Sequence, residues 1–487
     1  RWVYLHWPTM ADAQKAGILP ESVVVDDWVG NRTKSDVLLR FADEVIADRP
    51  THPVTSALLN REPPRFAGSG PRDGFFTDDL DDMRSWVTQL DNSYVPIQGP
   101  PGAGKTFNAA RLIHTLVRSG KRVGITAVGH HAIDNLLDGV VKYFTKKGDI
   151  GRLNAVRKPK QGTTPPDRPG VTIESNIEKC AIPAFNVVAG TTWLFGSKHM
   201  VAAPVDVLVV DEAGQLALAD TLAASLAAKS VLLVGDPLQL AQVTQASHPN
   251  GSGASVLDHV LDGDLTIPPD RGVFLSDTYR MHSDVCNFIS DQIYAGKLHS
   301  DVSCEQQTTV AGTGLRWLRA EHVGNSTSAP EEADLIVEEI RMLIGTPWTN
   351  QRGEVKRLKA KNFMVVAPYN RQRRLITERL SEHAEVADVP VGTVDKFQGK
   401  QAAVVFFSMT TSTGDLIVRG VDFLFSRNRL NVAISRARCL AYLVCTEELL
   451  DTRASDVDDM RLISTLNAFV EWANANGESR GGHAVSR

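Results

Sequence analysis

Short, fully apolar runs separated by amphipathic stretches recur along the chain from about residue 75. In the first half these runs are YVPIQ, RVGITAV, NVVAGT, VDVLVVDE and SVLLVGD, and a stretch with helical periodicity, NAARLIHTLVRSG, comes soon after the first of them. Buried strands that alternate with amphipathic helices are typical of a parallel sheet covered by helices on both faces. The pattern predicts an α/β domain over residues 75–270.

A second series of the same kind follows. Its apolar runs are NFMVVAPY, AAVVFFSMT and CLAYLVC, and its helical stretches are ADLIVEEIRMLI and RQRRLITERLSEHA. We therefore expect a second α/β domain over residues 271–470, in tandem with the first, and a flexible tail over residues 471–487.

Two segments fall outside this alternation. Residues 1–74 include a stretch that is dense in proline, glycine and serine, which predicts an N-terminal segment and linker, or a reduced accessory element. Residues 141–184 are polar and contain prolines, and they predict a small insertion in the first domain, either a subdomain or a long excursion of the chain.

Composition excludes several classes of protein. The 487 residues are 43% hydrophobic and 22% charged, which fits a folded protein of two or three domains. We find no apolar run long enough to span a bilayer and no signal segment at the start, so we expect a cytoplasmic protein with no membrane partner. Because the sequence begins with Arg1 rather than methionine, we also expect that a partner domain can precede it.

Charge and cysteine content narrow the picture further. The net charge is −5 and the isoelectric point is near 6.3, so any nucleic-acid site must be a local groove rather than a basic surface. The five cysteines form no CxxC pair. This argues against a disulfide scaffold, a zinc ribbon and an iron–sulfur cluster.

The segment GPPGAGKT lies between the apolar run YVPIQ and an amphipathic helix. It satisfies the pattern G-x-x-x-x-G-K-[ST], in which glycines let the backbone wrap around phosphates while amides and the helix dipole face the anion. Lys105 adds a positive charge at the β- and γ-phosphates, and the Thr106 hydroxyl can bind magnesium. The predicted ATP-binding residues are Gly99, Pro100, Pro101, Gly102, Ala103, Gly104, Lys105 and Thr106.

Polar residues end two later apolar runs. In VDVLVVDEAGQ the strand ends at Asp211 and Glu212, beside the P-loop of an open α/β sheet, so Asp211 can hold magnesium. Glu212 is then placed to orient or deprotonate the attacking water, which favours hydrolysis. In VLLVGDPLQL, Gln239 can donate to a γ-phosphate and is a candidate sensor of hydrolysis. Acidic helix caps and a plain turn are the structural alternatives.

The apolar stretch LNVAISRARCLAYLV carries two arginines, Arg436 and Arg438. A buried guanidinium keeps its charge and is costly to desolvate unless an anion meets it. Hydrolysis of ATP develops charge that a cation from a facing domain can neutralise. Because residues i and i+2 on a helix do not share a face, we expect only one of the two to reach the phosphate. A structural ion pair within the second domain is the alternative.

These segments occur together in a specific series. GPPGAGKT, DEAGQ, GDPLQL, TYRMH, VDKFQGKQ and LNVAISRAR, in this order, resemble the motifs of superfamily 1 helicases, and most of all the 1B group, over roughly residues 78–448. The resemblance implies two RecA-like P-loop domains with ATP and Mg²⁺ in the cleft between them. It also implies single-stranded DNA or RNA across the top of both domains and translocation from 5′ to 3′. Some bacterial relatives carry a fused nuclease, which is a candidate for the upstream domain.

The resemblance assigns further roles near the nucleotide. Arg436 becomes the arginine that reaches the phosphate, Arg280 of TYRMH becomes a second finger, and the ring of Tyr279 lies beside the adenine. Gln401 stands where relatives usually have a glutamate that holds the ribose. Relatives also read adenine with a glutamine upstream of the P-loop, whereas the corresponding TDDLDDMRSWV offers only acids, near Asp81 and Asp82.

The same resemblance points to contacts with nucleic acid that do not depend on base sequence. Hydroxyls suit contacts to the phosphate backbone, and the ring of Tyr369 either stacks on a base or packs in the core. Two basic clusters, within residues 356–361 and 371–374, either give a groove its positive field or are solvated surface. The predicted contact residues are Thr126, His130, Thr191, Thr192, Tyr369, Thr393 and Gln398.

The sequence therefore predicts an ATP-dependent helicase or translocase. The alternative is an ATP-regulated nucleic-acid-binding scaffold without productive unwinding, whereas a small-molecule kinase has no need for TYRMH or VAISRAR. The prediction covers DNA and RNA alike, because a protein that reads the backbone accepts either. The predicted catalytic residues are Lys105, Asp211, Glu212, Gln239, Arg280 and Arg436.

Overall fold

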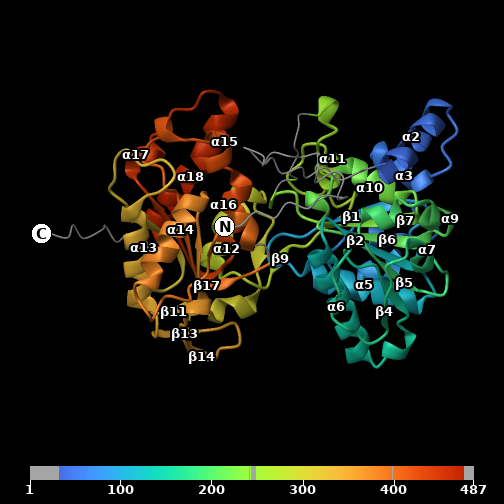
Figure 1. The fold of residues 1–487 in the computed structure, drawn as a ribbon, viewed down its shortest axis with the longest axis horizontal. Coiled ribbons are helices and arrows are strands. Elements are labelled where there is room, and N and C mark those ends of the chain that lie inside the picture. The colour runs from blue at the N-terminus through green and yellow to red at the C-terminus, as the bar shows by residue number, and fades with distance from the viewer. Residues whose placement is uncertain (1–31, 241, 243–247, 398, 477–487) are drawn as a thin grey trace, which may run out of the picture.

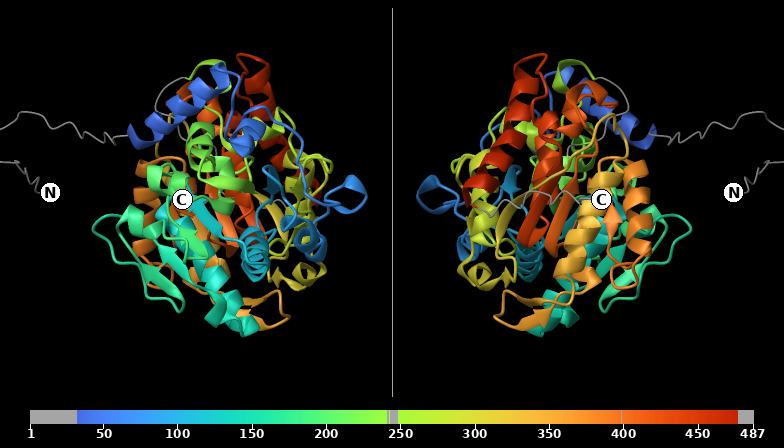
Figure 2. Two further views of the ribbon diagram at one scale, coloured as in Figure 1. Left: turned by 90° about the vertical axis from the view of Figure 1, so that its right-hand side faces the viewer. Right: turned by 90° about the vertical axis from the view of Figure 1, so that its left-hand side faces the viewer.

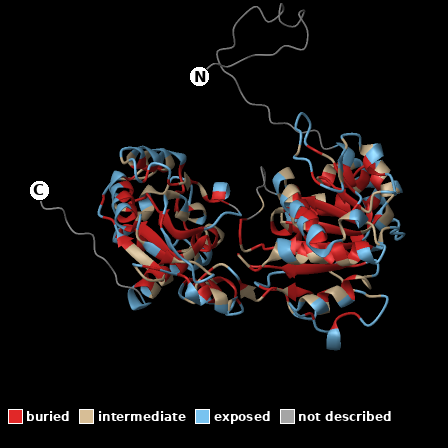
Figure 3. Cartoon of the chain, turned by 90° about the horizontal axis from the view of Figure 1, so that it is seen from below, coloured by how far each residue is buried: buried red, intermediate tan, exposed pale blue. Residues whose placement is uncertain are grey.

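Two α/β lobes in tandem make up the computed structural model, which describes residues 32–240, 242, 248–397 and 399–476 (Figure 1). The first lobe is coloured blue to green and the second yellow to red. Buried residues concentrate in the sheet of each lobe (Figure 3). The predicted fold class, two α/β domains with helix-covered parallel sheets, is confirmed.

The first domain is built on an eight-stranded sheet with the order β4-β3-β5-β2-β6-β7-β1-β8, and all of its strand pairs are parallel. Central strands such as β1 and β2 are buried along their whole length because helices cover both faces. The strands are β1 (Tyr94–Gln98), β2 (Val123–Ala127), β3 (Ala155–Arg157), β4 (Val171–Ile173), β5 (Val187–Ala189), β6 (Val205–Asp211), β7 (Ala228–Gly235) and β8 (Val273–Phe274).

Two apolar clusters cover the faces of this sheet. One joins the sheet to α4, α5 and α6, and the other joins it to α3, α8, α10 and α11. The helices of the domain are α2 (Arg32–Ile46), α3 (Pro53–Leu59), α4 (Leu80–Val87), α5 (Lys105–Arg118), α6 (His130–Lys147), α7 (Ile177–Cys180), α8 (Thr192–Phe195), α9 (Lys198–Ala202), α10 (Leu218–Ser225) and α11 (Val256–Leu261).

The segments that the sequence sets apart pack onto the first domain. Helices α2 and α3 of the N-terminal segment lie against α10, and Ala57 and Leu58 of α3 are fully buried (Figure 1). Residues 141–184 complete α6 and then add β3 and β4 to the main sheet, at the outer edge of the lobe (Figure 2, teal to green). This segment extends the sheet and is not a separate subdomain.

The second domain has a five-stranded parallel sheet with the order β12-β18-β17-β15-β16, plus two small ladders, β10-β9 and β11-β13-β14. The strands are β9 (Asp277–Thr278), β10 (His299–Ser300), β11 (Thr308–Thr309), β12 (Gly314–Arg319), β13 (Pro347–Thr349), β14 (Val355–Arg357), β15 (Phe363–Val366), β16 (Val391–Gly392), β17 (Ala402–Ser408) and β18 (Ala437–Cys445).

The helices of the second domain are α12 (Ser283–Ile293), α13 (Pro330–Leu343), α14 (Asn370–Ser381), α15 (Val421–Leu424), α16 (Arg427–Ile434), α17 (Glu447–Leu450) and α18 (Val457–Asn476). Helix α18 packs on β12 and buries Ala473, so residues 471–476 are helical rather than part of a tail, and residues 477–487 lie outside the described part of the chain. Among the described helices, none combines the length and the apolar character that a membrane span requires.

Candidate active site

A cavity of 680 Å³ lies between the two domains, and most of the motif residues line it. The first domain contributes the P-loop and the ends of β2 and β6, and the second contributes the turns around η7 (Val394–Phe397) and after α16. The lining residues discussed below are Pro100, Pro101, Gly102, Ala103, Gly104, Lys105, Thr106, Asp211, Glu212, Gln239, Tyr279, Arg280, Lys396, Lys400, Gln401 and Arg436.

The P-loop connects β1 to the first turn of α5. Gly102 (φ 82°) and Gly104 (φ 79°) have left-handed backbone conformations that glycine adopts without strain. A side chain on Gly102 would also place its Cβ 2.4 Å from Thr278 Oγ1. Lys105 begins the helix, and its Nζ donates to the carbonyl oxygen of Gly99 (2.5 Å). The loop thus aims the amino end of a 14-residue helix and one ammonium group at the cavity.

Two adjacent carboxylates lie at the carboxyl end of β6, where Asp211 is the last residue of the strand and Glu212 follows it. Asp211 is buried, and burial together with the neighbouring Glu212 charge raises its pKa to about 7, although Lys105 opposes the shift. Glu212 has a left-handed backbone (φ 53°) and accepts from Gln215 Nε2 (3.3 Å). Both carboxylates line the cavity.

The donor set suits magnesium held together with a nucleotide. Among the described residues there is no cluster of three or more His, Cys, Asp or Glu side chains that could hold a metal alone. Protein sites for Mg²⁺ typically use one or two carboxylates and complete the coordination with water and substrate phosphates. Asp211 and the Thr106 hydroxyl, both at the cavity, provide that partial set.

Arg436 lies in the turn between α16 and β18, with only 2% of its surface exposed. The expectation that both arginines lie on one helix is wrong, because α16 ends at Ile434 and Arg438 lies on the strand. The Nη2 atom of Arg436 donates weakly to Gln239 Oε1 (3.5 Å), and its Nε is buried without a partner. Burial lowers its pKa to about 10, so the guanidinium stays charged at neutral pH.

Arg280 approaches the cavity beside Arg436. Its Nη1 donates to the carbonyl oxygen of Ser435 (2.8 Å) and its Nε to Gln401 Oε1 (3.1 Å). Burial and the charges of Arg436 and Arg438 lower the pKa of Arg280 to about 9. Within the described residues neither Arg280 nor Arg436 has an ion-pair partner. The Glu212 charge acts on Arg436 only from beyond ion-pair contact. Two converging cations that no carboxylate contacts fit a polyanionic ligand.

A buried network joins the two domains behind Gln239. Asp236 accepts from Gln239 Nε2 (2.9 Å) and from the hydroxyl of Tyr294 in the second domain (2.7 Å). Asn431 on α16 donates to Tyr294 Oη (2.9 Å) and to the carbonyl oxygen of Leu238 (2.7 Å). The position of the candidate sensor Gln239 therefore depends on side chains of the facing domain.

The remaining nucleotide candidates lie at the open side of the cavity. Tyr279 is 54% exposed, and its amide donates to the Gly102 carbonyl oxygen (3.1 Å), which holds TYRMH against the P-loop. Gln401 lines the cavity, where its amide oxygen accepts from Arg280. Lys396 and Lys400 also line it, and sequence reasoning missed both although they lie within VDKFQGKQ. It missed Tyr294, which lies outside the motifs, and gave no role to Asn431, which lies within LNVAISRAR.

Two AAA-domain family models match the chain, one over residues 85–252 and the other over residues 254–448. The DNA polymerase alpha-associated DNA helicase A of Schizosaccharomyces pombe is 27% identical over 418 residues, 70% of this chain and 59% of that protein. The DNA replication ATP-dependent helicase/nuclease DNA2 of Gallus gallus is 27% identical over 362 residues, 72% of this chain and 34% of that protein.

Between them, the two family models cover both domains and every motif of the series. These matches support the resemblance to the superfamily 1B helicases. The chain spans between about a third and three-fifths of the length of these relatives. A solved structure of arterivirus nonstructural protein 10, a helicase, has a TM-score of 0.39 at 18% identity, over 72% of this chain and 59% of that one.

The structure corrects two of the contacts with nucleic acid that the helicase resemblance suggested. Thr126 lies within β2 and is fully buried, so its side chain cannot meet a ligand. Tyr369 is 6% exposed and packs in the core of the second domain, with its ring 5.8 Å from that of Phe423. His130 begins α6 but faces Arg157, whose Nη2 lies 3.0 Å from His130 Nδ1.

Two other candidates, Thr191 and Thr393, keep partly exposed positions that a ligand can approach, whereas Thr192 is buried. Thr191 and Thr192 follow β5 and line a smaller cavity of 280 Å³ on the first domain. Thr393 is partly exposed before η7, and Gln398 lies outside the described residues. The basic clusters are on the surface, where Lys356 pairs with Glu354 (2.6 Å).

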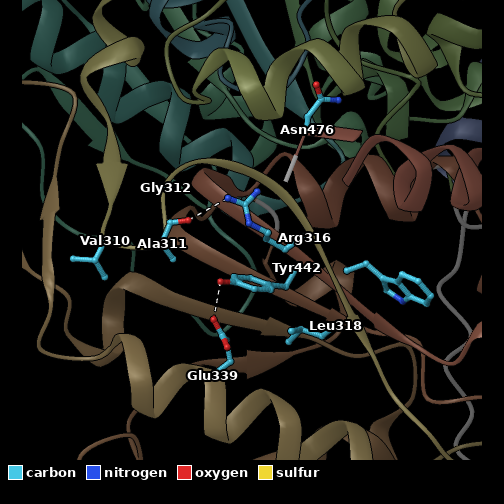
Figure 4. Close-up of a pocket in the computed structure, with 9 residues that line it drawn as sticks. Val310, Ala311, Gly312, Arg316, Leu318, Glu339, Tyr442 and Asn476 are labelled. Atoms are coloured by element: carbon cyan, nitrogen blue, oxygen red, sulfur yellow. Dashed lines mark hydrogen bonds between the residues drawn. The ribbon is translucent and has the colours of Figure 1, made fainter. Parts of the chain in front are cut away.

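A cavity of 370 Å³ within the second domain contains none of the predicted residues (Figure 4). Tyr442 donates to Glu339 there (2.9 Å), and Arg316 donates to the carbonyl oxygen of Ala311 (3.1 Å). Its polar groups bond to one another, and its lining includes none of the motif residues.

Proposed function

We propose that the chain hydrolyses ATP with Mg²⁺ and uses the energy to move from 5′ to 3′ along single-stranded nucleic acid and to unwind duplexes. One observation carries the proposal: the P-loop and two carboxylates of the first domain share a cavity with two guanidinium groups of the second, Arg280 and Arg436, which form no ion pair within the described residues. Such a cavity suits a triphosphate clamped between domains, and its chemistry depends on their closure.

Each side chain has a task that follows from its place. Lys105 and the amino end of α5 bind the β- and γ-phosphates, while Asp211 and Thr106 hold magnesium, which when bound neutralises phosphate charge. Glu212 orients the attacking water and receives its proton. Arg436, helped by Arg280, stabilises the charge that develops in the transition state. Gln239 links the γ-phosphate to the network of Asp236, Tyr294 and Asn431, so hydrolysis changes the contact between the domains.

Turnover of ATP is the direct test. We expect the wild type to hydrolyse ATP many times faster with a single-stranded oligonucleotide than without one. Arg436→Ala should lower the stimulated rate by about a thousandfold or more, as loss of an arginine finger does, and Lys105→Ala should abolish it. Arg341→Ala is a matched control, because Arg341 pairs with Glu385 on the surface of the same domain and should leave the rate unchanged.

The opposite result has a definite meaning. Wild-type protein that binds ATP and oligonucleotide but shows no stimulated hydrolysis would contradict the motor and favour the scaffold whose ATP site only regulates binding. Direction is tested with duplexes that carry either a 5′ or a 3′ single-stranded tail. Faster unwinding with the 5′ tail is expected, and equal or reversed rates would refute the proposed direction.

DNA is the first substrate to test, because the relatives named above are DNA helicases by name. Stimulation by DNA and RNA oligonucleotides of matched length, in one salt concentration, compares the two directly. The helicase/nuclease among the relatives supports a nuclease, fused upstream or associated, as a partner. Cleavage of single strands by the natural full-length protein, and not by residues 1–487, is then expected.

A further inference from the structure

The cavity of 280 Å³ on the first domain adjoins the candidate nucleotide site. Val128, which follows β2, lines both cavities. Thr191 and Thr192 follow β5, and Gln215 follows β6, so the cavity lies at the carboxyl ends of three neighbouring strands. In an open α/β sheet this edge is where ligands bind.

One large aromatic side chain lines this cavity. Trp193 is partly exposed and lies next to the threonine pair, outside every helicase motif of the chain. The ammonium group of Lys34, from α2, lies 4.1 Å from the centre of the Trp193 ring. A cation over one face holds the ring in place and leaves the rest of the indole at the cavity.

The charges around the indole cancel. Lys34 Nζ lies 2.5 Å from Asp220 Oδ1, and Asp220 is itself part of the cavity lining. A phosphate would find no free cation in this pair, whereas a flat uncharged ring would meet the indole, the partly exposed Thr191 and the side chain of Val128, which is 52% exposed. The chemistry of the cavity therefore suits a nucleobase better than the backbone.

We propose that Trp193 stacks on a base of the single strand as the strand crosses the first domain. The inference rests on the proposed function, because it takes single-stranded nucleic acid to be the ligand. Stacking on an aromatic ring tolerates any base, which a motor that moves along arbitrary sequence requires. Lys34, whose ammonium group lies over the ring, is a positioning residue for the indole.

Tryptophan fluorescence tests the contact separately from catalysis. Oligothymidylate of about 20 residues, titrated into the nucleotide-free protein, should quench the emission of the wild type. Trp193→Phe should lose most of that quenching and keep affinity within about threefold, because phenylalanine still stacks. Trp193→Ala should weaken binding by roughly tenfold, as expected for one lost stack. Trp472→Phe in the second domain, where Trp472 packs on Phe288, is the control that keeps the quenching.

Two comparisons separate stacking from a structural role. An abasic oligonucleotide of equal length should bind the wild type and Trp193→Ala alike, because it offers no base to stack. If Trp193 only anchors α2, then Lys34→Ala should weaken oligothymidylate as much as Trp193→Ala does, and the abasic strand should be weakened too. Either result, or unchanged quenching in Trp193→Phe, overturns the inference.

Failure of this inference and failure of the motor are distinguishable. Stimulated ATP hydrolysis with unchanged quenching in Trp193→Phe contradicts only the role of Trp193. Absent hydrolysis in a wild type whose quenching requires Trp193 contradicts only the motor.

Discussion

Arg157 and Arg436 are buried almost equally, one in each domain, yet their surroundings differ completely. Arg157, at the end of β3, donates to both carboxylate oxygens of Asp134 (2.9 and 3.0 Å) and to the backbone of His130 and Lys158. Arg436 has one long hydrogen bond to Gln239, and its Nε has no partner.

The difference separates a structural arginine from a functional one. Arg157 is neutralised by its own domain, where its hydrogen bonds and charge outweigh the effect of burial and lower the pKa of Asp134. A buried charge without a partner is destabilising, and a protein retains it where a ligand supplies the missing charge. The first domain therefore contains a complete ion pair between Arg157 and Asp134, whereas Arg436 in the second domain has no ion-pair partner within the described residues.

Alanine substitution at the two arginines should produce opposite patterns. Arg157→Ala removes the main partner of the partly exposed Asp134, which keeps only Arg168 (3.4 Å), and leaves buried acceptors without a donor, so it should lower the free energy of unfolding by about 1–3 kcal/mol. Arg436→Ala removes an unpaired charge and should leave stability unchanged or slightly higher. Urea unfolding followed by circular dichroism measures both, and ATP turnover of the folded fraction should survive in the first variant only. A large loss of stability in Arg436→Ala would contradict the comparison.

The burial of Arg436 and its need for an anion can be predicted from the sequence, whereas the ion pair of Arg157 cannot. Arg436 stands in an apolar stretch within a motif. Arg157 lies in a polar, proline-bearing segment whose strands have only three residues each, too short for periodicity to reveal. Its partner Asp134 is 23 residues away, and only the pairing of β3 with β5 brings the two together.

The predicted ligand contacts that the structure contradicts lie near the ends of strands. The sequence placed Thr126 and Tyr369 near the carboxyl ends of strands, where ligands bind, and that much holds. Whether such a side chain faces the ligand or the core depends on the pleat of the strand and the course of the next turn, which one sequence does not reveal. Arg436 was predicted on a helix for a similar reason, because apolar content alone does not locate the end of α16.

Tyr294→Phe tests how the hydrogen-bond network behind Gln239 is held in place. Burial and the Asp236 charge raise the pKa of Tyr294, so its hydroxyl keeps its proton and donates across the interface. Phenylalanine can neither donate to Asp236 nor accept from Asn431. The loss of these buried hydrogen bonds should lower the free energy of unfolding by about 1–2 kcal/mol. We expect kcat for stimulated ATP hydrolysis to fall about tenfold, with KM for ATP nearly unchanged.

A matched control lies in the same domain. Tyr442→Phe removes a buried hydroxyl that donates to Glu339, within the second domain, and should leave kcat unchanged. Equal effects of the two substitutions would mean that Tyr294 acts on stability alone and does not position Gln239.

His130→Asn should give the smallest effect, and it tests the surroundings of the Arg157–Asp134 ion pair. Burial and the Arg157 charge lower the pKa of His130, so the folded state binds this proton less readily than the unfolded chain does. The stabilisation is therefore present above the ordinary histidine pKa of 6.5 and is lost as pH falls below it. Asparagine keeps an acceptor near Arg157 and cannot titrate. Between pH 7 and pH 5 the free energy of unfolding, measured by thermal denaturation, should fall more for the wild type than for His130→Asn. The difference should be less than about 1 kcal/mol, because solvent screens this partly exposed group. His131→Asn is the control, because His131 contacts Asn135 instead (3.3 Å). Parallel pH profiles for the wild type and His130→Asn would show that the Arg157 charge does not act on His130.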